Sequence, residues 1–82
     1  MDMKAFKESV KTCGISGMSL KRDKTYNFIG SDGNLKTGKF IKLSAQWEGE
    51  RLFSFHFIMA DGRSYSIMAD YYGDQHHQFI EI

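Results

Sequence analysis

Apolar and polar residues alternate with a period of two along residues 51–69, and a single Asp61-Gly62 pair interrupts the alternation. Such alternation is typical of a strand with one buried face, and an Asp-Gly pair between two alternating runs favours a β-hairpin. The sequence therefore predicts a hairpin at the centre of a sheet. The apolar positions of its two strands are Phe53, Phe55, Phe57, Met59, Tyr65, Ile67 and Ala69.

A second alternating stretch, residues 39–47, predicts a third strand before the hairpin. A one-residue slip would turn every apolar side chain to the other face, so loop lengths have to match the apolar positions. Three-residue loops at 48–50 and 60–62 satisfy this condition, with Gly62 in the left-handed conformation of a G1 bulge. The predicted pairs are Trp47–Arg51, Ala45–Phe53, Leu43–Phe55 and Ile41–Phe57, then Met59–Arg63, Phe57–Tyr65, Phe55–Ile67 and Phe53–Ala69.

The remaining pattern predicts a short amphipathic helix over residues 2–12 and further strands at 18–22, 25–29 and 75–82. Asp2 suits the N-cap of this helix, and Cys13, at its end, is expected to be a small core residue rather than a reactive thiol. The apolar stripe of the helix consists of Met3, Phe6, Val10 and Cys13.

These elements predict one α+β domain spanning residues 1–82, with a short N-terminal helix on a curved antiparallel meander of four to six strands. The helix is expected to cover the row formed by Phe53, Phe55 and Phe57. The alternative is a small SH3-like or Sm-like barrel with the helix at one end. A chain of 82 residues has a thin stability margin, so a homo-oligomer that buries more surface is also compatible with it.

Composition bears on the compartment. The chain has a single cysteine and hence no internal disulfide, and it begins without an apolar leader. Its longest apolar run, residues 57–60, is far too short to span a membrane. We therefore expect a cytoplasmic protein without a membrane segment.

The net charge of +1 conceals an asymmetry along the chain. Residues 1–42 carry nine Lys/Arg against four Asp/Glu, whereas residues 43–82 carry two against six. Basic residues interleaved with aromatic ones are typical of β-surfaces that hold single-stranded nucleic acid. The alternative function is therefore nucleic-acid binding through Lys21, Arg22, Lys24, Lys36, Lys39 and Lys42.

Two stretches come close to phosphate or metal sites. Residues 33–40 nearly match a P-loop, but Phe40 stands where a hydroxyl would ligate Mg²⁺, and a strand follows in place of a helix. The other stretch, residues 70–77, has two adjacent histidines. On a strand they point to opposite faces, so they cannot share one metal there. Its metal-capable residues are Asp70, Asp74, His76 and His77. Neither a metal nor another cofactor is expected.

A catalytic set can be drawn around His56, with Ser54 or Ser66 as nucleophile and Asp70 as the orienting acid. No nucleophile elbow accompanies these residues, and serine and histidine on a sheet usually line its wetter face. The sequence therefore predicts a binding protein and not an enzyme.

Paired aromatic residues in an acidic loop favour contact with another protein, because tyrosine and histidine are amphipathic. Small size without a catalytic signature suits an inhibitor or adaptor of the kind that a phage or other mobile element encodes. The predicted contact residues are Tyr71, Tyr72, His76 and His77, joined by Trp47 and Arg51 at the neighbouring turn. If the sheet meets a partner with a face, the predicted face carries Ser54, His56, Ile58, Ser64, Ser66 and Met68.

Overall fold

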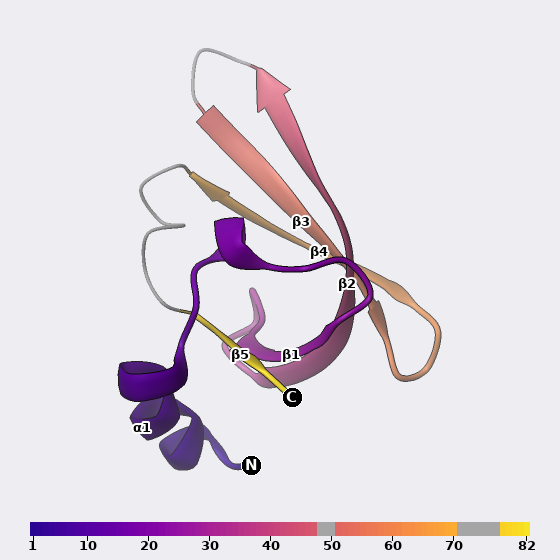
Figure 1. Cartoon of the computed structure of the whole chain (residues 1–82). Helices are drawn as coiled ribbons and strands as arrows, with labels where there is room; N and C mark the ends of the chain where they lie inside the picture. The colour runs from indigo at the N-terminus through magenta and orange to yellow at the C-terminus, as the bar shows by residue number, and fades with distance from the viewer. Residues whose placement is uncertain (48–50, 71–77) are drawn as a thin grey trace.

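The computed structural model describes residues 1–47, 51–70 and 78–82 (Figure 1). Its elements in chain order are α1 (Met3–Cys13), the 3-10 helix η1 (Gly17–Ser19), β1 (Thr25–Ile29), β2 (Leu35–Trp47), β3 (Arg51–Met59), β4 (Ser64–Asp70) and β5 (Phe79–Glu81). The predicted α+β class is confirmed, with one N-terminal helix packed on an antiparallel sheet. The short strand expected at 18–22 is wrong, because η1 lies there instead.

The sheet has five strands in the order β4-β3-β2-β1-β5. Strands β1 to β4 form the predicted meander, and β5 returns to pair with the free side of β1. Within the described residues β4 and β5 do not pair with each other, so the sheet stays open and the barrel alternative is wrong.

A bulge in β2 bends the sheet. The first part of β2 pairs with β1, and the register against β3 shifts between Phe40 and Lys42. Ile41 is the extra residue, and Phe40 takes the place opposite Phe57, so the predicted Ile41–Phe57 pair is wrong. An extra residue in one strand increases local bending and twist, and β2 curves strongly in Figure 1.

All other predicted pairs that can be read in the ladders are confirmed, from Trp47 opposite Arg51 to Phe53 opposite Ala69. The turn between β3 and β4 also has the predicted conformation. Gly62 has φ +84°, its N–H donates to the Met59 carbonyl at 2.9 Å, and the Met59 N–H donates to the Arg63 carbonyl at 2.9 Å. This is the three-residue loop with a left-handed glycine that the apolar register requires.

The bend brings aromatic side chains from four strands into one core. Phe28 of β1 stacks on Phe57 of β3 with ring centroids 4.4 Å apart, and Phe79 of β5 lies 6.0 Å from Phe57. Burying each ring contributes about 1.5–3 kcal/mol, which suits a small chain without a disulfide. The buried cluster comprises Tyr26, Phe28, Phe40, Phe55, Phe57 and Phe79.

Helix α1 lies beside β5 and not over the row of Phe53, Phe55 and Phe57 (Figure 1). Asp2 caps it by accepting a hydrogen bond from the Ala5 N–H at 2.7 Å, as an N-cap aspartate does. Phe6 is its fully buried residue, whereas Cys13 is exposed, so the predicted core role of Cys13 is wrong.

The connector after α1 covers β5. The Ile15 N–H donates to the Phe79 carbonyl at 2.8 Å, and the Phe79 N–H donates to the Ile15 carbonyl at 3.1 Å. Leu20 packs against the aromatic core, and the Lys21 N–H donates to the Tyr26 hydroxyl at 2.8 Å. Over the ranges that the structure describes, no helix has the length and apolar character to cross a membrane.

Candidate functional site

Strands β2, β3 and β4 turn one set of side chains to the aromatic core and the alternate set to the opposite side, here called the outer face. The pairs Ser44–Ser54, Lys42–His56, His56–Ser66 and Ile58–Ser64 place the set predicted from alternation on this side. The described side chains of the outer face on these three strands are Thr37, Lys39, Lys42, Ser44, Ser54, His56, Ile58, Ser64, Ser66 and Met68.

His56 bridges three strands on the outer face. Its Nδ1 lies 2.9 Å from the Ser66 hydroxyl of β4, and its Nε2 lies 2.8 Å from the Ser44 hydroxyl of β2. A neutral imidazole has one donor and one acceptor nitrogen, and a serine hydroxyl can serve either. Both ring nitrogens are therefore engaged, and the ring is held in one orientation.

The predicted catalytic set is only partly brought together. Ser66 does contact His56, but Ser54 is only 5% exposed and pairs with Ser44 across the ladder. Among the side chains that the structure describes, no carboxylate hydrogen-bonds the imidazole. The side chain of Asp70, the predicted orienting acid, lies outside the described part of the chain, and the two hydroxyl contacts hold the imidazole in one orientation.

Strand β4 is the open edge of the sheet. Hydrogen-bonded pairs alternate along an antiparallel ladder, and Met59–Arg63 is such a pair. By this alternation Ser64, Ser66 and Met68 direct their backbone N–H and C=O groups away from β3. In the described part of the chain no backbone segment bonds to this side of β4, whereas the equivalent side of β5 is covered by Ile15.

The other side of β4 is held firmly in place. The Tyr65 hydroxyl accepts a hydrogen bond from the Ser31 N–H at 2.9 Å and lies 3.1 Å from the Ser31 hydroxyl. The Lys36 ammonium lies 5.2 Å from the centroid of the Tyr65 ring, within cation–π range. The turn between β1 and β2 is thereby tied to β4.

The same turn carries a perturbed acid. Asp32 accepts hydrogen bonds from the Asn34 N–H at 3.0 Å and forms an ion pair with Lys36 at 3.1 Å. The backbone bond from Asn34, followed by the Lys36 ammonium, holds the pKa of Asp32 below the ordinary value of 3.8. Lys36 is thus engaged with the turn and with Tyr65, and it is not part of an exposed basic surface.

The other predicted basic residues are exposed. Lys39 and Lys42 stand on the outer face, across the ladder from Ile58 and His56. The remaining three predicted basic residues lie in the loop before β1, which meets β2 where the Phe40 N–H donates to the Lys24 carbonyl at 2.9 Å. These three residues are Lys21, Arg22 and Lys24. The described side chains of the outer face on β2, β3 and β4 include no acid.

The aromatic residues that the sequence interleaves with the basic ones do not form an exposed platform on these strands as described. Tyr26, Phe28 and Phe40 are all buried in the core. They are therefore not available to stack on bases, and the described side chains of the outer face are mainly charged or hydroxyl-bearing.

The residues predicted for protein contact fall mostly outside the described residues. These are Tyr71, Tyr72, His76 and His77, together with Asp74 of the predicted metal-capable stretch. Trp47 and Arg51 lie opposite each other at the ends of β2 and β3. Within the ranges that the structure describes, no group of three or more metal-ligating side chains gathers.

Comparison with protein-family models, with curated proteins and with solved structures finds no match. The open edge of β4 is a feature that sequence reasoning missed, because it depends on strand order. The available signal was local: Ser64, Ser66 and Met68 alternate at the end of the meander.

Proposed function

We propose that this protein is a non-catalytic binding protein that engages another protein through the β4 edge and the adjoining outer face. Its role is that of a cytoplasmic inhibitor or adaptor. The observation that carries the proposal is the unpaired edge of β4, where Ser64, Ser66 and Met68 present backbone donors and acceptors. An edge of this kind is a template for an added strand.

The partner segment binds in an extended conformation. Main-chain hydrogen bonds to β4 supply affinity, and side chains on alternate positions of the added strand supply specificity. Met68, which is 55% exposed, offers an apolar contact on the outer face. Lys39 and Lys42 favour a segment with acidic side chains, since the described side chains of this face include no acid.

Rigidity of β4 supports this reading. Tyr65 ties the strand to Ser31, and Ser66 ties it to His56, so the edge is ordered before a partner arrives. A pre-ordered edge lowers the conformational entropy that binding would otherwise cost.

A photo-crosslinking residue at position 66, introduced into the protein in its native cell, tests the proposal. Position 66 should capture one polypeptide, whereas position 37, on the same face of β2 but beside β1, should not. Capture of nucleic acid alone, or equal capture from both positions, would contradict the proposal. Crosslinking of the purified protein to a second copy of itself would identify self-association through β4 in place of a foreign partner.

The captured complex then permits a sharper comparison. Ser64→Pro removes an outward N–H at the first residue of β4, where proline is tolerated, and Ser64→Ala keeps that N–H. Loss of one edge hydrogen bond should weaken binding roughly fivefold to tenfold in the proline variant and leave the alanine variant unchanged. Equal affinities of the two variants would show that the partner does not pair with β4.

Nucleic-acid binding is the second candidate, because the Lys24 carbonyl bonds to the Phe40 N–H of β2, and the exposed Lys39 and Lys42 lie on either side of Phe40 in that strand. Contacts to phosphates would make affinity fall steeply with salt, with a slope in log–log form of about −0.9 per phosphate neutralised on duplex DNA. Mobility-shift assays of wild type and Lys39→Gln/Lys42→Gln should then differ most at low salt. No shift at low salt would eliminate this candidate.

A further inference from the structure

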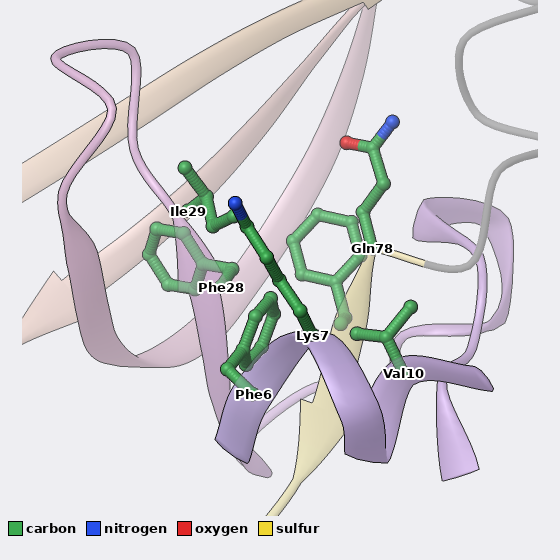
Figure 2. A pocket seen from close by; sticks show the side chains of 7 residues that line it. Phe6, Lys7, Val10, Phe28, Ile29 and Gln78 are labelled. Atoms are coloured by element: carbon green, nitrogen blue, oxygen red, sulfur yellow. The ribbon is translucent and has the colours of Figure 1, made fainter. Parts of the chain in front are cut away.

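A hollow of about 400 Å³ lies between α1 and the β1–β5 end of the sheet. Figure 2 shows Phe6 and Lys7 extending from the helix toward Phe28 and Ile29 of β1, with Val10 on the side of Gln78. Its volume falls within the range of about 300–1,000 Å³ that is usual for small-molecule sites. It is at the opposite end of the strand order from β4, so it is independent of the protein-binding edge.

The walls of this pocket are mainly apolar. Phe6, Phe28 and Phe79 contribute rings that are almost fully buried, and Val10 and Ile29 remain partly accessible. Ile29 keeps 37% of its surface exposed. A ligand with a hydrocarbon body would remove this remaining apolar surface from water, which favours binding.

The charge at the rim selects the head group of the ligand. Lys7 lines the pocket with an exposed ammonium, and none of the described residues that line it is acidic. On the same helix the ammonium of Lys11 already faces Glu8 at 3.5 Å. Lys7 is therefore the cation available to an anion entering the pocket, and a charge-assisted hydrogen bond to a carboxylate is stronger than one between neutral groups.

We propose that this pocket binds a medium-chain carboxylate, with its hydrocarbon chain over Val10 and Ile29, above the buried rings, and its carboxylate on Lys7. The ligand also bridges α1 to the sheet. An isolated helix of 11 residues is marginal, and α1 packs mainly against the short strand β5. Occupancy should therefore raise the melting temperature, because the ligand binds only the folded chain.

Titration of the purified protein with decanoate, below its micelle-forming concentration, tests the proposal. The expected result is saturable change in the NMR signals of the three rings and a rise in melting temperature. Lys7→Met keeps an unbranched side chain of similar length without the charge and should weaken decanoate binding about tenfold. Lys11→Met makes the same charge change outside the pocket and should leave the affinity within about twofold.

Two further measurements separate this site from unspecific association. Decanol should bind wild type and Lys7→Met equally, because it lacks the charge that Lys7 recognises. Val10→Trp should fill the pocket, keep a folded amide spectrum and abolish decanoate binding. Unsaturable signal changes, equal weakening by Lys7→Met and Lys11→Met, or undiminished binding to folded Val10→Trp would each overturn the proposal.

Discussion

The phenolic oxygen of Tyr65 on β4 accepts a hydrogen bond from the backbone N–H of Ser31, a residue 34 positions earlier in the turn between β1 and β2. Tyr65 sits opposite Phe57 in the ladder, and its ring lies 6.1 Å from that of Phe28. The bond therefore ties β4 to the turn between β1 and β2 across the curve of the open sheet. It joins the proposed binding strand to a turn with which β4 shares no ladder.

Replacing Tyr65 by phenylalanine removes this bond and leaves the ring in the core. We expect a loss of about 0.5–1.5 kcal/mol in the free energy of unfolding, which lowers the melting temperature by roughly 4–8 °C per kcal/mol in a domain of this size. Urea and thermal unfolding measure both. Ser31→Ala keeps the backbone donor and should cost less. A Tyr65→Phe variant as stable as wild type would show that water replaces the hydroxyl without loss.

Asp32 gives a prediction on pH. Its pKa is lowered first by the Asn34 N–H and then by Lys36, so its folded-state pKa lies below its unfolded one. Its contribution to stability is therefore present above the unfolded pKa and is lost as pH falls through the folded pKa. In Lys36→Met the pKa of Asp32, followed by NMR of its carboxyl carbon, should rise but stay below 3.8, because the Asn34 bond remains. An unmoved pKa in this variant would show that the ion pair is unimportant.

Gly62 and Gly38 should respond differently to substitution. Gly62 has φ +84° with open space around its Cβ position, so Gly62→Ala should cost about 1–2 kcal/mol through the backbone alone, and Gly62→Asn should cost less. A Cβ at Gly38 would meet Met59 Sδ at 2.9 Å and Phe57 Cβ at 3.1 Å, a packing conflict. Asparagine should therefore be worse than alanine at 38. The same rank order at both positions in urea unfolding would contradict this distinction.

The hairpin register could be predicted because two constraints act on it at once. The apolar face of β3 fixes which residues of β4 point inward, and only an odd loop length keeps both faces aligned. The outer face followed from the same alternation, including the contact of Ser66 with His56. Local pattern was sufficient wherever both partners of a pair are close in the chain.

Long-range placement could not be predicted in this way. The stripe on α1 shows that one helix face is buried, but nothing in it identifies β5 as its support. In β5 both Phe79 and Ile80 are buried, so period two is lost and the strand order is unreadable. The open edge of β4 follows from that order. Because the order could not be read, the predicted contact surface was the tyrosine pair and not this edge. The role of Tyr71 and Tyr72 stays a prediction.

Deleting Ile41 tests whether the bulge shapes the molecule. Phe40 and Lys42 would keep their partners and faces, but β2 would lose the extra residue that bends it. We expect β1 to swing away from β3 and the 4.4 Å stack of Phe28 on Phe57 to be lost, at a cost of at least one buried ring, about 1.5–3 kcal/mol. Ring-to-ring NOEs and urea unfolding measure this. Ile41→Ala keeps the bulge and should retain the NOEs, whereas a deletion variant that also retained them would show that the sheet curves without it.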